Sequence, residues 1–321
     1  MGRFLQHRFG RKVFKIGVDA GFSCPHRGRL RTSGGCSFCS PHGSRSPLIG
    51  DSADIYAQVR TNAAYWQQRY PGCGLLLYFQ AYTSTLAPTQ LLSEIYSAGL
   101  SAGEEMPVQE SAAPAGSDEN PGFLGMVVGT RPDCISDEVI ELLSSFKNSR
   151  REVWVELGLQ SAHESSLRLL NRGHGIEEYR DAAARLAAQG IPVIPHLIFG
   201  IPGEGESQRL QTIKWVLDTT PSIIGIKLHN LVLLPGTPLH AAFTAGDIPL
   251  YTIDEHLEAV ASALRFIPDD IAIMRVTADI PGGSTGIPGG GWSSTVFVGL
   301  LQKVMRKRGW FQGCGLLNGI T

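Results

Sequence analysis

Short apolar segments alternate with segments of helical period along this chain. Residues 13–19 (VFKIGVD) alternate apolar and polar positions, as does a strand with one buried face. Further strands are predicted at 75–80, 124–129, 153–158, 193–199 and 223–229, and an additional strand candidate lies at 271–276. Helices are predicted at 52–69, 89–100, 136–146, 164–170, 176–189, 207–219 and 253–266.

The order of these elements indicates an α/β fold. Six strands separated by helices at intervals of roughly 25–45 residues are typical of parallel βα units. Several strands are apolar on both faces, which parallel sheets covered by helices require. About six units are too few for a closed eight-stranded barrel, so we expect a partial, open TIM-type barrel with its chemistry at the carboxyl ends of the strands.

Length and composition fit one domain built on this barrel. The chain has 321 residues, of which 43% are hydrophobic, enough for a sizeable core. We expect a single domain over 1–321, with its core at about 13–235 and a C-terminal extension at about 236–321. The small, acidic and aperiodic segment 101–121 predicts a flexible surface insertion.

Charge is balanced overall but uneven along the chain, because 28 basic residues offset 29 acidic ones. Basic residues gather near both ends, where they either contact a polyanion or are solvated: Arg3, Arg8, Arg11, Lys12, Lys15, Lys303, Arg306, Lys307 and Arg308. The sequence has no apolar stretch of the roughly 20 residues that cross a bilayer and no signal-peptide pattern. We therefore expect a cytoplasmic protein with no membrane partner, whose six cysteines are ligands or free thiols.

The strongest chemical signal is a cysteine triplet directly after the first strand. Cys24 precedes a C-x-x-C pair formed by Cys36 and Cys39. Three thiolates can hold a [4Fe–4S] cluster and leave one iron open to another ligand. Gly34 and Gly35 would let the backbone pass close to such a cluster.

The triplet taken alone is compatible with three alternatives. A structural zinc site in an adaptor domain would take its fourth ligand from His26 or His42. A thioredoxin-like pair should open a helix, whereas Cys36 and Cys39 lie in a predicted loop. The cysteines could also be inert.

The triplet and several longer motifs resemble the radical S-adenosylmethionine (SAM) superfamily, in its YhcC-like branch. The core of this branch is similar to the radical SAM domain of the Elongator catalytic subunit. The resemblance covers nearly the whole chain except 101–121, through the segments DAGFSCP, GGCSFC, YFQAYT, GTRPDCISDEVI, VWVELGLQSAHE, LNRGH, IFGIPGE and IKLHNLVLLPGTPL. The spacing from Cys24 to Cys36 departs from the common C-x3-C-x2-C motif, but this branch carries a long first gap.

The resemblance implies two cofactors, a [4Fe–4S] cluster on Cys24, Cys36 and Cys39 and SAM bound to the open iron. Reductive cleavage of SAM would then give a 5′-deoxyadenosyl radical that abstracts a hydrogen atom. Phe38 falls where the family packs an aromatic ring against adenine, although it could simply pack within the loop. Gln80 and Thr83 stand where the superfamily often has a Gly-Gly-Glu element that binds the SAM amino group.

Further cofactor-binding candidates follow from the same resemblance. Glu156 and Gln160 end the fourth predicted strand, where a carboxylate could accept from the ribose or the ammonium of SAM. Because Glu156 lies in an apolar strand, we expect a ligand or an arginine to pair with it. His196 lies on the fifth strand, and Gly200 and Pro202 form the turn after it, which suits either adenine or an ordinary βα connection.

Catalytic and substrate-binding candidates surround the same predicted mouth. Arg131 could bind a carboxylate or phosphate of the substrate, or the carboxylate of SAM. Asp133 either shares this cavity or caps the helix near Ser136. Cys134 could quench a substrate radical or pack as a small apolar side chain. The remaining candidates, each catalytic or structural, are Arg172, His174, Lys227 and His229.

Two substrates are compatible with this enzyme class. The first is a transfer RNA (tRNA) modified at the C5 side chain of its wobble uridine, suggested by the Elongator-like core, the basic ends and the cationic mouth. The second is a small carboxylated or phosphorylated metabolite. An electron donor such as flavodoxin or ferredoxin would be a further partner.

Overall fold

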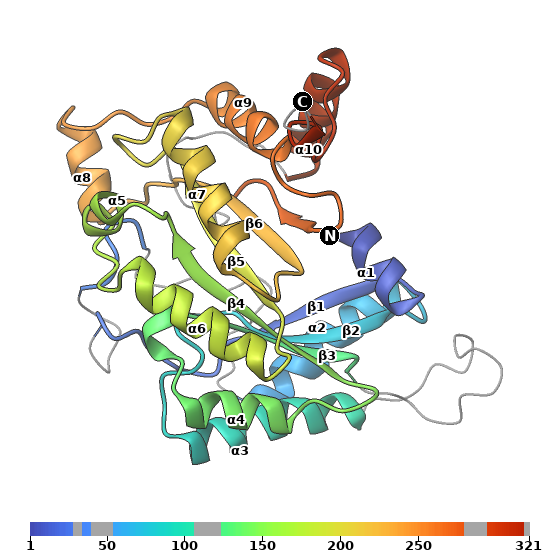
Figure 1. Cartoon of the computed structure of the whole chain (residues 1–321). Helices are drawn as coiled ribbons and strands as arrows, with labels where there is room; N and C mark the ends of the chain where they lie inside the picture. The colour runs from blue at the N-terminus through green and yellow to red at the C-terminus, as the bar shows by residue number, and fades with distance from the viewer. Residues whose placement is uncertain (28–33, 40–53, 106–122, 279–293, 318–321) are drawn as a thin grey trace.

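The computed structural model describes residues 1–27, 34–39, 54–105, 123–278 and 294–317. Within them, seven parallel strands form one sheet whose spatial order equals their order in the chain. The strands are β1 (Val13–Val18), β2 (Gly74–Phe79), β3 (Gly125–Thr130), β4 (Glu152–Gln160), β5 (Val193–Phe199), β6 (Gly225–Asn230) and β7 (Ala272–Arg275). The sheet curls into a half-barrel, which confirms the predicted open barrel, and the candidate at 271–276 is its seventh strand (Figure 1).

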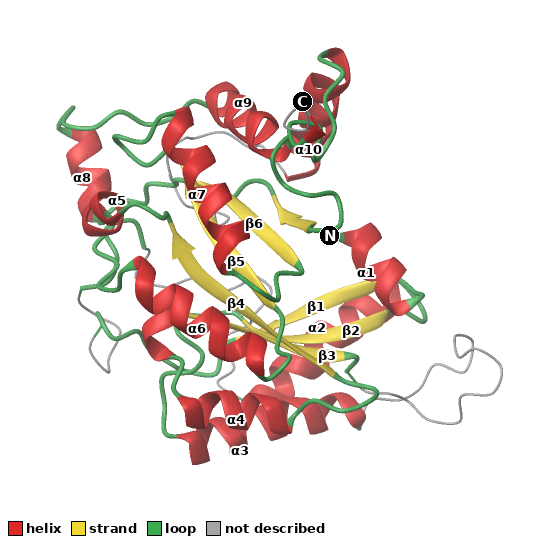
Figure 2. Ribbon diagram, viewed as in Figure 1, coloured by secondary structure: helices red, strands yellow, loops and turns green. Residues whose placement is uncertain are grey.

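Predicted helices flank the strands and cover the outer face of the sheet (Figure 2). They are α2 (Ile55–Arg69), α3 (Thr89–Glu104), α4 (Asp137–Ser145), α5 (Glu164–Leu169), α6 (Ile176–Ala188), α7 (Glu206–Thr219) and α9 (Ile253–Leu264). Side chains of Asp54, Ser136 and Thr252 accept hydrogen bonds from the first turns of α2, α4 and α9 and so fix where these helices begin.

Three helices were not predicted: α1 (Gly2–Phe9), α8 (Pro238–Thr244) and α10 (Ser294–Lys307). Helix α1 lies against the amino-terminal ends of the strands, where Leu5 is fully buried. The rings of Phe4 and Phe9 lie 6.2 and 6.0 Å from that of Trp154 on β4. Because α1 has eight residues and several polar ones, its apolar pattern is too short to distinguish from a loop.

Two predicted boundaries differ from the structure. Helix α3 continues to Glu104, so the first residues of the expected insertion at 101–121 are helical. The rest of that segment, from 106, lies outside the described residues. Strand β7 extends the sheet beyond residue 235, and the division between core and C-terminal extension stays a prediction. In the described part of the chain, no helix is long and apolar enough to cross a membrane.

The concave side of the sheet is filled in layers. The lowest layer, at the amino-terminal ends of the strands, is apolar and consists of Leu5, Val13, Leu76, Val127, Trp154, Ile194 and Met274. Two positions further along the strands, the inward-facing side chains become polar and charged: Lys15, Tyr78, Glu156, His196 and Lys227. The carboxyl ends of the strands and the cysteine loop lie above this polar layer.

Candidate active site

The cysteine loop brings Cys24, Cys36 and Cys39 together at the carboxyl end of β1. Cys24 Sγ lies 3.0 Å from Thr83 Oγ1, and the Cys39 amide donates to the Cys36 carbonyl at 3.0 Å. Burial, and next the neighbouring Cys36, raises the pKa of the Cys39 thiol to about 11. Such a thiol stays protonated at neutral pH unless a metal or another positive charge favours the thiolate.

The surroundings of the three thiols fit an anionic iron–sulfur cluster. Arg172 Nη1 donates to Cys36 Sγ at 3.3 Å, and Arg27 Nη2 donates to the Cys39 carbonyl at 2.7 Å. At Gly35, which has a φ of +106°, a Cβ would lie 2.7 Å from Arg27 Nε, so a side chain there would displace this arginine. Cationic side chains and a close backbone are what a thiolate-bound cluster needs.

A single-ion site is not seen in the part of the chain that the structure describes. No three side chains of His, Cys, Asp or Glu there stand close enough to share one metal ion. A cubane needs no such convergence, because each thiolate binds a different iron. The imidazole of His26, one proposed zinc ligand, packs directly over Gly173, where an added Cβ would clash with its Nε2. His42 lies outside the described residues.

Arg172 connects the cysteine loop to the end of β4. Its Nη2 donates to the Gly158 carbonyl at 2.7 Å, and its Nε donates to His174 Nε2 at 3.1 Å. Burial, and next the charge of Arg172, lowers the pKa of His174 to about 4. The neutral imidazole can therefore accept this bond at neutral pH, and the structure brings both predicted residues to the mouth as a positioning pair.

Arg131 is buried at the end of β3 and forms a two-bond pair with Asp133. Its Nε and Nη2 donate to the two carboxylate oxygens at 2.9 and 2.8 Å, whereas its buried Nη1 has no hydrogen-bond partner among the described residues. Ser136, not Asp133, accepts from the Val139 amide at the start of α4, and the Asp133 carboxylate pairs with Arg131 instead. A buried donor without a partner suits an anionic group of a ligand.

Gln160 occupies a strained position in the same region. Its φ is +80°, and the pairing of β4 with β5 shifts register between Gly158 and Gln160. Positive φ is costly for a residue with a side chain, and such strain concentrates at functional sites. A Cβ on Gly158 would lie 2.9 Å from Gln160 Nε2, so this glycine leaves room for the glutamine amide.

The other sequence candidates have mixed surroundings. Phe38 packs against an apolar cluster that includes Leu170 and Ile198. Gly200 has a φ of +83°, a Cβ on it would lie 3.0 Å from the Tyr251 ring, and Pro202 lies in the turn that follows. Burial, and next Asp133, raises the pKa of Cys134 to about 12, so this thiol is protonated at neutral pH.

Glu156 lies in the middle of β4, not at its end, and its side chain is fully buried. The Lys15 ammonium donates to Oε1 at 2.6 Å. Its Oε2 accepts from Lys227 at 2.5 Å, from His196 Nε2 at 2.9 Å and from the Tyr78 hydroxyl. A carboxylate accepts about four hydrogen bonds, and four protein donors surround this one, three of them at Oε2. The expected ligand or arginine partner is thus replaced by two lysines, a tyrosine and a histidine, and contact with SAM stays a prediction.

Burial sets the protonation of this polar layer. Burial alone would raise the pKa of Glu156, but Lys15, Lys227 and His196 together hold it well below its ordinary value. Burial, and next Lys227, lowers the pKa of His196 to about 4. Burial lowers the pKa of Lys227 to about 7, although Glu156 opposes this shift. At neutral pH the layer therefore contains an ionised carboxylate, a neutral imidazole and a lysine near its titration point.

His229 lies beside this layer, with its ring centre 5.4 Å from that of His196. Burial, and next His196, holds the pKa of His229 well below its ordinary value. Its Nε2 is buried and finds no hydrogen-bond partner in the part of the chain that the structure describes. A neutral imidazole with a free ring nitrogen can bind a ligand, so the predicted role of His229 in the cavity is chemically feasible.

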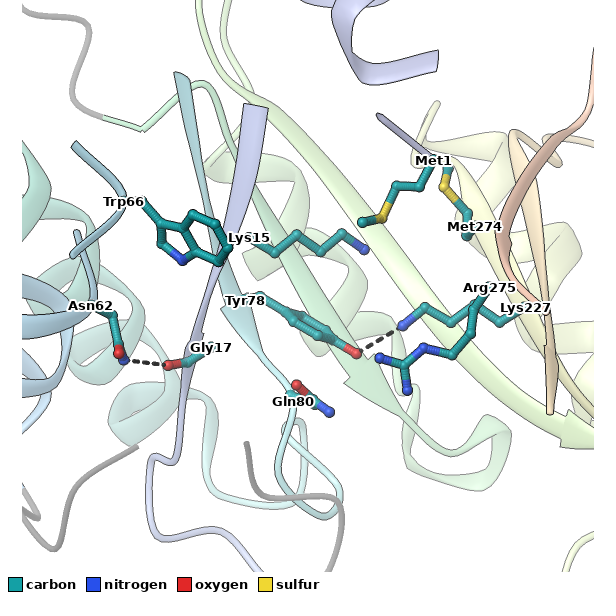
Figure 3. A pocket seen from close by; sticks show the side chains of 10 residues that line it. All are labelled: Met1, Lys15, Gly17, Asn62, Trp66, Tyr78, Gln80, Lys227, Met274 and Arg275. Atoms are coloured by element: carbon teal, nitrogen blue, oxygen red, sulfur yellow. Dashed lines mark hydrogen bonds between the residues drawn. The ribbon is translucent and has the colours of Figure 1, made fainter. Parts of the chain in front are cut away.

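A cavity of about 170 Å³ opens over the polar layer between the two edge strands β1 and β7 (Figure 3). Its lining residues are Met1, Lys15, Gly17, Asn62, Trp66, Tyr78, Gln80, Lys227, Met274 and Arg275. Gln80 and Lys227 were predicted to belong to the site. Sequence reasoning missed Lys15, Tyr78, Trp66 and Arg275; Lys15 stands at a polar position of the alternating strand 13–19, so the pattern alone did not distinguish it from a solvated residue.

The basic ends of the chain are only partly free. Lys15, which we assigned to a basic terminus, has a side chain only 9% exposed and pairs with Glu156. Arg8 pairs with Glu152 and Arg308 with Glu258. Arg3, Lys303 and Lys307 are exposed and stay available to a polyanion.

A curled parallel half-barrel with three cysteines at the carboxyl end of its first strand defines a class of cofactor-dependent enzymes. The chain belongs to the radical SAM superfamily, whose family model matches residues 24–216, and a radical SAM C-terminal domain matches residues 223–307. Enzymes of this superfamily use a [4Fe–4S] cluster and SAM, which confirms the expected cofactors. The family model identifies no individual ligand, so the roles of individual residues stay proposals.

Two sequence relatives and one solved structure illustrate what the chain is similar to. Protein YhcC of Escherichia coli is 34% identical over 283 residues, which are 86% of this chain and 82% of YhcC. A tRNA uridine(34) acetyltransferase of Methanocaldococcus infernus is 29% identical over 58% of this chain, which spans only 34% of that protein. The structure of archaeal Methanocaldococcus infernus Elp3 with an N-terminal deletion shares the fold, with a TM-score of 0.71 at 22% identity over 94% of this chain and 64% of that one.

Proposed function

We propose that this radical SAM enzyme binds its cluster through Cys24, Cys36 and Cys39 and modifies the C5 side chain of a wobble uridine in tRNA. The three cysteines in one loop at the carboxyl end of β1, with Arg172 donating to Cys36, carry the first part. Similarity to a tRNA uridine(34) acetyltransferase over 58% of the chain supports the second. When bound, the cluster and SAM supply reductive cleavage of SAM to a 5′-deoxyadenosyl radical that abstracts a hydrogen atom.

The chain's own residues would bind and orient these groups. Arg172 stabilises the Cys36 thiolate by a charge-assisted hydrogen bond and positions the loop against β4. Arg131 Nη1 and His229 Nε2 have no hydrogen-bond partner within the described ranges, so they would suit SAM or the substrate. Phe38, Gly200 and Pro202 would contact adenine, as the family resemblance implies.

The tRNA would contact basic residues outside the barrel. Arg3, Lys303 and Lys307 are exposed and can neutralise phosphates. The barrel mouth would then receive a base that has left the stack. The proposed setting is the cytoplasm, with flavodoxin or ferredoxin as the electron donor.

Anaerobic reconstitution tests the radical chemistry directly. The wild-type protein should contain about four irons per chain and release 5′-deoxyadenosine from SAM with dithionite. Cys36→Ala should lose both properties. Cys73→Ala, which removes a half-buried free thiol before β2, should keep them. A colourless protein containing zinc would refute the proposal.

Nucleoside analysis tests the RNA substrate. Incubation with unmodified tRNA should shift the mass of the wobble uridine, and binding should weaken steeply with salt. If SAM is cleaved but tRNA binding does not depend on salt and the uridine is unchanged, the tRNA proposal is wrong. The substrate would then be a small anionic metabolite, which the cationic lining of the cavity favours.

A further inference from the structure

We propose that the cavity between β1 and β7 binds an anionic group of the substrate, a carboxylate or a phosphate, through Lys15, Lys227 and Arg275. This inference rests on the proposed function only in assigning the cavity to the substrate of that enzyme. It adds an anion subsite in the barrel interior, below the strand ends where the cysteines lie.

The lining of the cavity is cationic. Lys15 comes from β1, Lys227 from β6 and Arg275 from β7, and among the described residues none of the lining side chains is acidic. Figure 3 shows the Lys227 and Arg275 side chains directed toward the Tyr78 hydroxyl, with Lys15 on the opposite wall. Lys227 Nζ lies 3.1 Å from that hydroxyl, which can donate to a bound anion only if it releases Glu156. The cations therefore supply the main attraction.

Glu156 balances the charge of the two interior lysines incompletely. It supplies one negative charge, and both Lys15 and Lys227 bind it, one at each carboxylate oxygen. Buried cations are costly unless they are paired. An anion in the cavity would give the two ammonium groups and the Arg275 guanidinium a further partner, so binding would relieve part of the desolvation cost.

Size and wall chemistry limit the ligand. The cavity volume of about 170 Å³ is many times the roughly 10–15 Å³ that one water needs. Trp66 forms an apolar wall and is held by stacking on Phe14, with ring centres 4.2 Å apart. Asn62 is held by its bond to the Gly17 carbonyl at 3.2 Å. A preformed site of this kind suits an anionic group attached to an apolar or planar body.

The position of the cavity gives the subsite a role in orientation. Gln80 lines the cavity and directly follows β2, and Thr83, three residues later, contacts Cys24. A substrate fixed by its anionic end near Lys227 would therefore extend along the barrel axis toward the cysteine loop. Fixing one end of a substrate is an efficient way to place its reacting carbon.

Calorimetry on the anaerobically reconstituted holoenzyme tests the subsite without turnover. Sulfate and acetate are the probes, because they represent phosphate and carboxylate chemistry and keep their charge between pH 6 and 9. Wild type should bind at least one of them saturably. Arg275→Gln should weaken this binding about tenfold or more, since a charge-assisted hydrogen bond is lost. Lys12→Gln removes an exposed lysine three positions before Lys15 and is the matched control, which should bind like wild type.

Lys227→Met is a second variant, and Lys227→Arg keeps the charge in case loss of the pair with Glu156 impairs folding. Lys227→Met should abolish binding of the probes, and Lys227→Arg should retain most of it. Tighter sulfate binding would identify a phosphate, and tighter acetate binding a carboxylate. The subsite is refuted if neither probe saturates, or if Arg275→Gln and Lys12→Gln behave alike. Failure of the proposed function would appear instead as missing iron or uncleaved SAM, which this binding assay does not measure.

Discussion

Replacing Glu156 with glutamine should destabilise the protein far more than the same replacement at Glu152. Both carboxylates lie on β4 and both pair with a cation, but the Glu156 side chain is fully buried whereas that of Glu152 is 32% exposed. Glutamine keeps one acceptor oxygen and removes the charge. At position 156 it leaves Lys15 and Lys227 as buried cations without a carboxylate.

The magnitude follows from this difference in burial. Removing one partner of a buried ion pair costs about 3–5 kcal/mol, whereas an exposed pair contributes about 0–1 kcal/mol. With an unfolding entropy of about 2.1 cal/mol/K per residue, a chain of 321 residues loses about 1.5 °C in Tm per kcal/mol. Glu156→Gln should therefore lower Tm by about 4–8 °C, and Glu152→Gln by about 1.5 °C or less.

Circular dichroism during slow heating of the holoenzyme, under anaerobic conditions, measures the difference. The double variant Glu156→Gln with Lys227→Met should recover part of the lost Tm, because it also removes one unpaired cation. If Glu156→Gln melts within about 1 °C of Glu152→Gln, the buried pairs do not stabilise the fold and the reasoning from burial is wrong.

Three further predictions concern the site. Arg172→Met should lower iron retention, measured by absorbance during exposure to a chelator, whereas Arg168→Met on exposed α5 should not. Gln160→Gly should raise the free energy of unfolding by about 1 kcal/mol in chemical denaturation, because glycine tolerates positive φ. The same variant should slow SAM cleavage. An unchanged cleavage rate would show that the strained glutamine has no part in the reaction. Sulfate affinity should increase as pH falls through 7, because Lys227 then gains its proton, and a flat profile between pH 6 and 8.5 would contradict this. Among the described residues, the titratable or charged groups that face Lys227 are Lys15, Tyr78, Glu156, His196, His229 and Arg275.

The periodicity of apolar residues and the order of strands and helices along the chain predicted the half-barrel correctly. The strands are short and continuous, and each is followed by an amphipathic helix, so local pattern and final topology agree. The failures were elements whose identity depends on contacts far along the chain. Helix α1 gains its stability from Leu5 packing against residues of several strands, which no local period can reveal.

The part of the site whose residues lie close together in the sequence was predictable. Cys24, Cys36 and Cys39 lie within sixteen residues, and one loop brings them together. The polar layer was harder, because Lys15 and Glu156 are 141 positions apart and meet only after the sheet curls. The environment of Glu156 as a costly buried group was predicted correctly, but its partners were not, since pairing depends on strand register.

The polar layer also has a mechanical consequence for the half-barrel. In a closed barrel, hydrogen bonds around the ring fix the radius. Among the described strands, β1 and β7 are the two edges of this sheet and do not pair with each other, so backbone hydrogen bonds alone do not set its curvature. Glu156 on β4 binds Lys15 on β1, across β2 and β3, and Lys227 on β6, across β5. These ion pairs cross the concave side of the sheet and therefore fix the distance between its two halves. The distance from the cysteine loop after β1 to the strands on the other side of the half-barrel thus depends on these buried side chains. A redesigned interior must keep side chains long enough to make the same contacts.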